Sequence, residues 1–341
     1  IQENTLSPND FILPIFLIDG SNKKEAISTM PGVYRYTINR VSQIVDRAIK
    51  IGVPMVALFP KTKNSLKNEL GTESLNEKNL VCKAIQEINA DILIEASFTD
   101  IKTGQPAISH MESALKSNKH VVSTNKGPFA VAYKQIFNLA ALLKKNVVIE
   151  GTVMSGTPII NVLNNGLLGS DITAVSGIMN GTSNYIFSKM ELGMSYSDAL
   201  LQAQQLGYAE ADPTSDVEGL DTLAKVMILA NVVFDEQLIQ EDIEVRGISD
   251  ITLSDVKEAS SKNERWKLIG SVWKDNNGKV HGSVSPKLVP INDSLYGISD
   301  AINALKITSN ILGDTTIVGA GAGKIETGFA LYNDIISIVN R

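Results

Sequence analysis

The sequence predicts an α/β protein, with a parallel sheet in its first half and a mixed sheet with helices on one face in its second half. Up to about residue 151, apolar strand-like runs alternate with amphipathic helical segments, a rhythm typical of parallel sheets. After residue 151 the strands come closer together, and two of them flank the hairpin-type turn "DNNG" at 275–278. A chain of 341 residues with 43% hydrophobic residues is long enough for two domains.

The first half reads as successive strand–helix units. Strands are predicted at 11–19, 54–60, 90–97, 120–126 and 146–151, and helices at 39–52, 76–88, 106–119 and 132–145. Three of these strands end at Ser97, at Ser123–Lys126 and at Glu150. Because ligands collect at the carboxyl ends of strands in an open parallel sheet, we expect chemistry at these three endings.

The second half has its own signals. A strand is predicted at 171–180, and the helix at 195–207 has a serine cap and a terminal glycine. Further strands are predicted near 243–249, 267–274, 279–285 and 305–311, and a glycine-rich turn followed by a helix at 319–339.

Composition excludes several classes of protein. The formal net charge is −6 without a basic cluster, so nucleic acid and anionic membranes are poor partners, and no run of about 18 apolar residues predicts a membrane span. Cys82 is the single cysteine, which rules out an intrachain disulfide and indicates a small buried side chain in a reducing cytoplasm. His110, His120 and His281 lack metal-ligand spacing and are interpreted as surface or structural residues.

Lys225 is the first candidate site residue. It lies in "AEADPTSDVEGLDTLAKVMILA" (209–230), which opens with five carboxylates and continues as an apolar helix. On an exposed helix, an Asp–Lys pair four residues apart stabilises by only about 0.2–0.5 kcal/mol. Here every neighbour from 223 to 230 is apolar or alanine, which indicates a buried helix. A buried ammonium needs a partner, and Asp221 is available, so the pair predicts a lysine that holds substrate or moves a proton.

Three further segments leave two interpretations open. Lys126, in "STNKGP", is either a solvated turn residue or a site lysine beside other strand ends. "EGTVMSGTP" (150–158) places Glu150 before a polar loop that suits a hard cation, although spacing alone favours an ordinary capped loop. "GAGAG" (319–323) could bring backbone N–H groups to a phosphate, but it lacks the full G-x-G-x-x-G form. The first 90 residues contain only isolated glycines and no dinucleotide fingerprint.

From about residue 89 onward the chain resembles the homoserine dehydrogenase family. The resemblance is carried, in the family's order, by "ADILIEASFTDIKTGQPA", "HVVSTNKGP", "EGTVMSGTPII", "GIMNGTSNYI", "GYAEADPTSDVEGLDTLAKVMILAN" and "GAGAGKIET". It implies NAD- or NADP-dependent interconversion of L-homoserine and L-aspartate 4-semialdehyde, a step in the biosynthesis of threonine, methionine and isoleucine. It also implies a cytoplasmic homodimer.

The resemblance assigns roles by position. It implies Lys225 as the catalytic lysine with Asp221 as its partner acid, Lys126 as a second active-site lysine, Glu210 and Asp216 as acids of the substrate site, and Thr182 in the substrate-facing loop. The chemistry of the reaction agrees with this role of Lys225, because hydride transfer to an aldehyde needs a proton donor at the developing alkoxide.

Cofactor and cation sites are also implied by the resemblance. Glu150 with the backbone at Val153, Ser155 and Thr157 matches the family's monovalent cation (sodium) site, which replaces the capped-loop interpretation. The segments that match the nicotinamide end of the cofactor site contain Ser97, Ser123, Lys126, Gly321 and Gly323.

Residues 1–88 depart from that family. "LSPNDFILPIFLIDG", "ISTMPGVYRYTI" and "GVPMVALFP" resemble the N-terminal part of porphobilinogen synthase (5-aminolevulinate dehydratase), a β/α barrel. The chain then reads as a chimera: two β/α units (1–88), a partial Rossmann-like parallel sheet (89–152 and 318–341), and an α+β mixed-sheet domain for substrate binding, catalysis and dimerisation (153–317). Two β/α units cannot close a barrel, so they either extend the edge of the parallel sheet or pack loosely with exposed strand edges.

Two functions remain as hypotheses. The chain is a homoserine dehydrogenase whose NAD(P) binding is weakened by the missing phosphate-binding turn, since each hydrogen bond to a charged group contributes roughly 1.5–3 kcal/mol. Alternatively, it is an inactive fold that keeps only a dimerisation surface. A dehydratase is disfavoured, because the residues for that chemistry are absent.

Overall fold

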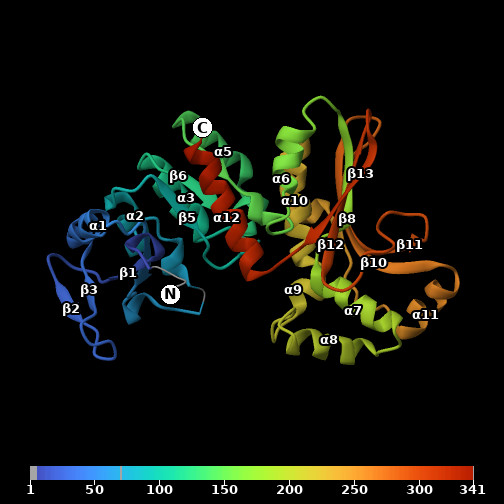
Figure 1. Ribbon diagram of the computed structural model, residues 1–341, viewed down its shortest axis with the longest axis horizontal. Coiled ribbons are helices and arrows are strands. Elements are labelled where there is room, and N and C mark those ends of the chain that lie inside the picture. Colours follow the sequence, from blue (N-terminus) through green and yellow to red (C-terminus); the bar gives the residue numbers. More distant parts are fainter. Residues whose placement is uncertain (1–5, 70, 341) are drawn as a thin grey trace, which may run out of the picture. The chain divides into compact units, whose positions relative to one another are not determined.

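The computed structural model describes residues 6–69 and 71–340, and their contacts divide the chain into two compact units (Figure 1). The first unit comprises the chain up to Ser97, together with Gln105–Val121 and Asn138–Val147. The second comprises Phe98–Gly104, Val122–Phe137 and the chain from Val148 onward. The elements form an α/β fold with parallel and mixed sheets, as predicted.

The first unit begins with a four-stranded sheet in the order β2-β3-β1-β4. Its elements are β1 (Ile12–Leu17), β2 (Lys24–Ala26), β3 (Tyr34–Tyr36) and β4 (Met55–Pro60), with helices α1 (Val41–Lys50) and α2 (Leu80–Glu87). β1 is parallel to β3 and β4, whereas β2 is antiparallel to β3. Ile15, Leu17, Val45 and Ala84 belong to one apolar core between this sheet and the two helices.

A second sheet has the order β5-β6-β7 and is separate from the first. Its strands are β5 (Ile92–Glu95), β6 (His120–Ser123) and β7 (Val147–Val148), connected through α3 (Ala107–Lys116), α4 (Lys126–Val131) and α5 (Tyr133–Leu142). The boundary between the units crosses β6 after Val121 and β7 after Val147. The N-terminal strands therefore do not extend this sheet. They form a sheet of their own, and α2 packs against α3.

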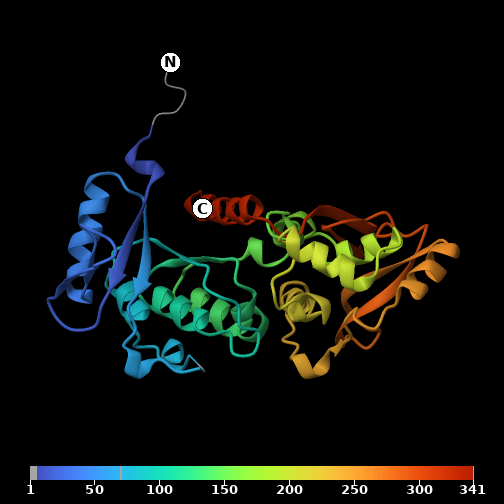
Figure 2. The same ribbon diagram turned by 90° about the horizontal axis from the view of Figure 1, so that it is seen from below.

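The second unit is built on a six-stranded mixed sheet in the order β13-β12-β8-β10-β11-β9. Its strands are β8 (Ile172–Ile178), β9 (Glu244–Val245), β10 (Glu264–Lys274), β11 (Val280–Pro290), β12 (Ile302–Ser309) and β13 (Gly313–Ala320). Helices α7 (Gly181–Glu191), α10 (Leu220–Phe234) and α11 (Leu253–Ser261) contact its strands (Figure 2).

The remaining helices are α6 (Ile159–Asn161), α8 (Tyr196–Gln205), α9 (Thr214–Val217) and α12 (Lys324–Val339). Short 3-10 turns lie at Pro8–Asp10, Ile38–Arg40, Asn64–Leu66, Thr72–Leu75, Glu150–Thr152 and Gln240–Asp242, and a π turn at Val162–Gly166. Within the described residues, no helix combines the length and the apolar character needed to cross a bilayer.

Helix α10 lies close to the sheet because two strand residues have no side chain. A Cβ added at Gly270 on β10 would come within 2.7 Å of Thr222 and 3.0 Å of Val226 on α10. A Cβ at Gly282 on β11 would come within 3.1 Å of Val226. The helix is buried from Thr222 to Asn231, which confirms the all-round apolar pattern of the sequence.

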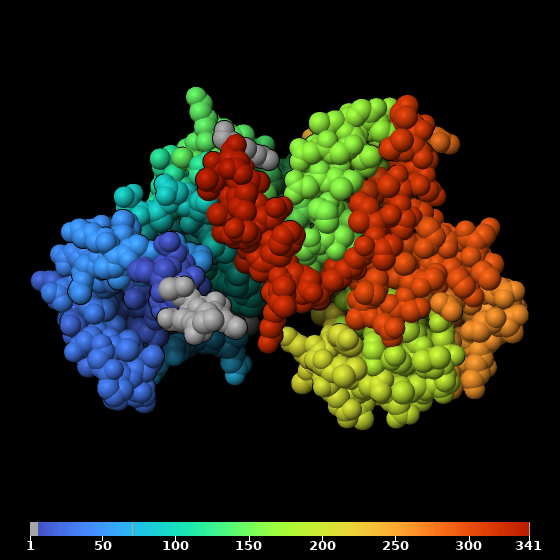
Figure 3. All heavy atoms as spheres, viewed as in Figure 1, coloured from blue at the N-terminus to red at the C-terminus, as the bar shows by residue number. Residues whose placement is uncertain are grey.

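Helix α12 has two different faces. Figure 3 shows it in red at the surface, and its buried residues Ala330, Asp334 and Ile338 recur every four positions. The more exposed face carries apolar side chains at heptad-like spacing: Ile325, Phe329, Tyr332, Ile336 and Val339. Asp334 is therefore a carboxylate on the face of the helix that points into the protein.

Lys267 on β10 is a buried cation that should make stability depend on pH. Its side chain is 0% exposed, and its Nζ donates to the Ile298 carbonyl at 2.8 Å and to Asn184 Oδ1 at 3.1 Å. Burial lowers the pKa of this ammonium to about 8, although the negative charge of Glu191 acts to raise it.

The unfolded chain keeps the Lys267 proton up to its ordinary pKa of 10.5, while the folded protein releases it near pH 8. Between these values the unfolded state binds more protons, so the free energy of unfolding should rise with pH. Lys267→Met should lack this rise, because methionine does not titrate. Urea unfolding of both proteins at pH 7.5, 9 and 10.5 measures it, and parallel pH curves for the two would contradict it.

Candidate active site

Lys225 and Asp221 form a buried ion pair on α10. Lys225 is 5% exposed, and its Nζ lies 2.7 Å from Asp221 Oδ2, one helical turn earlier. The same Nζ donates to the Met179 carbonyl at 2.5 Å. Burial lowers the pKa of the Lys225 ammonium, although Asp221 opposes this effect. The structure thus places the pair as the sequence predicted, out of water and in direct contact.

Asp221 is shared between two lysines. Its Oδ1 lies 3.2 Å from Lys126 Nζ, at the start of α4, while its Oδ2 faces Lys225. Burial alone would raise the pKa of Asp221, but the two ammonium groups outweigh burial and hold this pKa far below its usual value. Lys126 is therefore in direct contact with the acid of the ion pair, although its side chain is still 27% exposed. Its place depends on Gly127, where a Cβ would lie 2.3 Å from the Asp100 carbonyl oxygen.

Asp216 is joined to this pair through Asn180. The Asn180 side-chain nitrogen donates to Asp216 Oδ1 at 2.7 Å and to Asp221 Oδ2 at 3.0 Å. Burial raises the pKa of Asp216 despite the hydrogen bond from Asn180. Asn180 was not singled out from the sequence; its one local signal was an asparagine before a helix start, the usual sign of an N-cap.

Thr182 is buried near Asp216, whereas Glu210 is exposed to solvent. Thr182, on the first turn of α7, is 5% exposed and donates its hydroxyl to the Tyr208 carbonyl at 2.7 Å. Its hydroxyl also lies near Asp216 and opposes the effect of burial on the pKa of this acid. Glu210 is exposed, and within the described part of the chain its carboxylate makes no hydrogen bond or ion pair. Glu210 is thus a free acid, not a member of the buried network.

Glu150 lies in a second buried polar cluster. Its side chain is 2% exposed and accepts from the backbone nitrogens of Ile160 at 2.8 Å and Asn161 at 2.9 Å, and from the Asn161 side chain. These donors make it a cap for the start of α6. Burial nevertheless raises its pKa, because the donors only partly replace water.

Asp334 on α12 adds a second acid to this cluster. It is 0% exposed, and its Oδ2 accepts from the Glu150 backbone nitrogen at 3.0 Å. Its Oδ1 has no hydrogen-bond partner, and burial raises the pKa of Asp334 to about 7. No ion pair among the described residues involves either acid, so two buried carboxylates lie here without a neutralising cation. The loop residues Ser155 and Thr157 bond to Thr327 and to the Ala320 carbonyl instead.

The expected cofactor residues fall in both units. Ser97 is in the first unit, where its backbone nitrogen donates to Glu95 Oε1 at 3.0 Å. Ser123 is fully buried in the second unit, and its hydroxyl accepts from the Asn125 backbone nitrogen at 3.0 Å.

The glycine-rich turn allows no side chain at Gly321 or Gly323. A Cβ at Gly321 would lie 2.0 Å from the buried amide of Asn303, and one at Gly323 would lie 1.8 Å from Glu326. Gly323 caps α12, so the turn leads into a helix N-terminus as the sequence predicted. Glu326 places its own carboxylate at this end of the helix, which leaves less positive potential for a bound phosphate.

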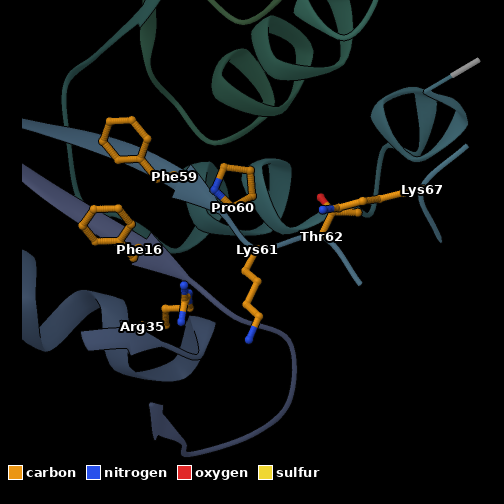
Figure 4. A pocket seen from close by; sticks show the side chains of 7 residues that line it. All are labelled: Phe16, Arg35, Phe59, Pro60, Lys61, Thr62 and Lys67. Atoms are coloured by element: carbon orange, nitrogen blue, oxygen red, sulfur yellow. The ribbon is translucent and has the colours of Figure 1, made fainter. Parts of the chain in front are cut away.

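A separate pocket lies in the first unit and contains none of the predicted site residues. It has a volume of about 350 Å³ and lies at the ends of β1, β3 and β4 (Figure 4). It is lined by Phe16, Arg35, Phe59, Pro60, Lys61, Thr62 and Lys67. Arg35 and Lys61 both pair with Glu25, at 2.9 and 2.7 Å.

The cluster around Lys225 is suited to proton transfer at an alcohol or carbonyl oxygen. An ammonium has three N–H donors, and two of those of Lys225 bond to Met179 and Asp221. The third is left for an incoming oxygen. Burial lowers the pKa of Lys225, which makes the loss of its proton easier than for an exposed lysine.

Two family profiles match the chain. The profile described as "Homoserine dehydrogenase" matches residues 158–336, and the profile described as "Delta-aminolevulinic acid dehydratase" matches residues 1–118. The second match confirms the resemblance of the N-terminal segment, but it extends beyond residue 88, so it does not locate a join there.

Curated relatives and solved structures agree with the first profile. An "NAD(+)-dependent homoserine dehydrogenase" of Pseudomonas canavaninivorans is 44% identical over 285 residues, 83% of this chain and 80% of that protein. A homoserine dehydrogenase of Methanocaldococcus jannaschii is 41% identical over 260 residues, 75% of each chain. The crystal structure of the enzyme from Thiobacillus denitrificans matches with a TM-score of 0.71 and 30% identity, over 96% of this chain and 73% of that one.

An NADPH complex is also among the similar structures. It is a mutant of a hyperthermophilic archaeal homoserine dehydrogenase, with a TM-score of 0.66 and 26% identity, over 97% of this chain and 98% of that one.

Proposed function

The chain belongs to the homoserine dehydrogenase family, and from this premise we propose how its residues perform the NAD(P)-dependent interconversion of L-homoserine and L-aspartate 4-semialdehyde. The observation that carries the proposal is the buried Lys225–Asp221 pair, with Nζ and Oδ2 2.7 Å apart. The test is homoserine oxidation by the purified protein, followed by the absorbance of NAD(P)H. Absence of turnover with both NAD and NADP would contradict it.

Lys225 handles the proton. In the oxidation direction its neutral amine accepts the proton of the homoserine hydroxyl, and in the reverse direction its ammonium returns a proton to the oxygen of the aldehyde. Asp221 keeps the amine aimed at that oxygen. Burial of Lys225 strengthens the attraction between its ammonium and the developing alkoxide, because water is excluded.

The other acids and Lys126 hold the substrate. Glu210 is exposed and unpaired in the described part of the chain, so it is available for the substrate ammonium. Asp216 adds a second carboxylate, which is hydrogen-bonded to Asn180. Thr182 bonds to the carbonyl of Tyr208, two residues before Glu210. Lys126 pairs with Asp221 and adds positive charge near the reacting oxygen.

We propose that the residues present suit the nicotinamide end of the cofactor better than its phosphate end. Bound NAD or NADP supplies the two-electron acceptor for the alcohol carbon. Lys126, Ser123, Ser97, Gly321 and Gly323 are the residues we propose at its nicotinamide end. For the phosphate end, the first 90 residues contain only isolated glycines, and the N-cap of α1, the first α-helix after β1, is Arg40.

We therefore expect weak binding of NAD(P). Loss of three hydrogen bonds to the pyrophosphate, at the low end of about 1.5 kcal/mol each, lowers affinity about a thousandfold. Isothermal titration of the purified protein with NAD and with NADP measures this. A dissociation constant in the low micromolar range would contradict the expectation.

We also propose that Glu150 and the backbone at Val153, Ser155 and Thr157 hold a monovalent cation such as sodium. The support is the charge imbalance: Glu150 and Asp334 are buried acids, and Asp334 Oδ1 has no partner. Within the described residues no three of His, Cys, Asp and Glu gather as a metal-ligand group.

Sodium chloride should therefore raise the melting temperature more than choline chloride at the same ionic strength, because a ligand that binds the folded state stabilises it. Glu150→Gln should abolish the difference between the two salts. Its one amide oxygen can keep only part of the α6 cap, because the two backbone donors bond to different oxygens of Glu150. Differential scanning fluorimetry measures both. An equal response to the two salts in the parent protein would contradict the cation site.

The domain assignments remain proposals. We propose residues 1–88 as a segment of the dehydratase type, 89–152 with 318–341 as the remaining nucleotide-binding part, and 153–317 as the substrate domain, in a cytoplasmic, chimeric homodimer. Sedimentation of the purified chain distinguishes monomer from dimer. A dimer without turnover would favour the second candidate, an inactive fold, which the dehydratase match over residues 1–118 supports.

A further inference from the structure

Asn180 lies where β8 ends and α7 begins, and its side chain bonds in three directions. It is 4% exposed, and its Oδ1 accepts from the Ser183 backbone nitrogen at 2.8 Å, which caps α7. Its Nδ2 donates to Asp216 Oδ1 at 2.7 Å and to Asp221 Oδ2 at 3.0 Å. One amide thus connects a helix start to two partly buried acids of the candidate active site.

We propose that Asn180 is a positioning residue that holds Asp216 and Asp221 together and fixes Asp221 toward Lys225. This inference rests on the role proposed above for the lysine.

The two acids need a shared donor because like charges repel. No ion pair within the described residues involves Asp216, whereas Asp221 contacts both Lys225 and Lys126. An amide nitrogen has two N–H groups, which allows one hydrogen bond to each carboxylate. Asn180 therefore lets two partly buried carboxylates lie side by side with only one of them directly paired to a cation.

The shared oxygen sets the orientation of Asp221. Oδ2 accepts from both Asn180 and Lys225, while Oδ1 faces Lys126. Without the amide, the carboxylate can rotate and exchange its two oxygens. Met179, the residue before Asn180, accepts from Lys225 Nζ through its carbonyl. Two successive residues at this junction therefore fix both partners of the ion pair and direct the third donor of Lys225 to the substrate.

The test separates positioning from helix capping. Asn180→Ser keeps a good N-cap, but its hydroxyl is too short to reach both acids. It should lower kcat for homoserine oxidation about 10- to 100-fold, with a smaller change in KM, the loss expected for one hydrogen bond to a charged group. Asn180→Asp also keeps the cap but adds a third carboxylate, which raises the pKa of its neighbours. In the Asn180→Asp variant, the acidic limb of the plot of kcat against pH should move to higher pH by about one unit.

Asn79 provides the matched control. It is the N-cap of α2 in the first unit, is 7% exposed, and accepts from the Cys82 backbone nitrogen at 2.9 Å. Asn79→Ser and Asn79→Asp make the same changes at a buried cap and should leave kcat and the pH profile unchanged.

The Asn180→Ser and Lys225→Ala variants test the role of Asn180 and the role of Lys225 separately. If Asn180→Ser keeps the parent kcat and pH profile while Lys225→Ala loses turnover, the inference about Asn180 is wrong and the role of the lysine stands. If Lys225→Ala keeps full turnover, the proposed role of the lysine is wrong. A crystal structure of Asn180→Ser needs no turnover: a rotated Asp221 supports the inference, and an unchanged 2.7 Å contact with Lys225 beside an unmoved Asp216 overturns it.

Discussion

Lys225→Ala should lower kcat for homoserine oxidation by about 10²- to 10⁴-fold, the usual contribution of a positioned proton-transfer group. Lys225 is 5% exposed and has one N–H donor left after its bonds to Met179 and Asp221, and this donor reaches the reacting oxygen in the proposed mechanism. KM should change less than kcat, because the lost interaction forms mainly in the transition state. Steady-state kinetics with saturating NAD(P) measure both constants.

Lys262 is the matched control for this variant. It pairs with Glu258 at 2.6 Å in the same i,i+4 geometry, but both side chains are at least 60% exposed. Lys262→Ala should leave kcat unchanged. Turnover of Lys225→Ala within a factor of about three of the parent would show that the buried lysine does not move the proton.

Asp221→Ala should destabilise the folded protein as well as inactivate it. It leaves the buried Lys225 ammonium without its carboxylate, and removal of one partner from a buried ion pair costs about 3–5 kcal/mol. Because Asp221 raises the pKa of Lys225 against the effect of burial, its loss should lower the pKa of the lysine further. In homoserine oxidation Lys225 acts as the base, so the acidic limb of any remaining activity should move to lower pH. Urea unfolding and the pH profile measure the two effects.

Glu258→Ala supplies the comparison for stability. The exposed pair of Glu258 and Lys262 should contribute about 1 kcal/mol or less, as exposed ion pairs do. A loss of stability in Asp221→Ala no larger than that in Glu258→Ala would show that the buried pair adds little to folding.

Local patterns in the sequence account for what was predicted well. β1, β4, α1 and α2 follow directly from apolar runs and helical spacing. The contact between Lys225 and Asp221 also follows from a spacing of four residues on one helix.

Short strands and long-range contacts were not predictable in this way. β2 and β3 have three residues each, too few for a clear alternation, and β13 reaches into the glycine-rich run that was interpreted as a turn. Asn180 meets Asp216 and Asp221 from 36 and 41 positions away, so its role depends on how α7, α9 and α10 pack. The bond between Glu150 and Asp334 spans 184 positions and has no local signal.

The central claim is that the amine of Lys225 carries the proton in homoserine oxidation, and chemical rescue tests it most directly. In Lys225→Ala, added ethylamine should restore turnover in proportion to its concentration, with a pH dependence set by the added amine. The parent protein should not respond to ethylamine. If ethylamine restores nothing and the variant keeps the parent pH profile, the claim is wrong.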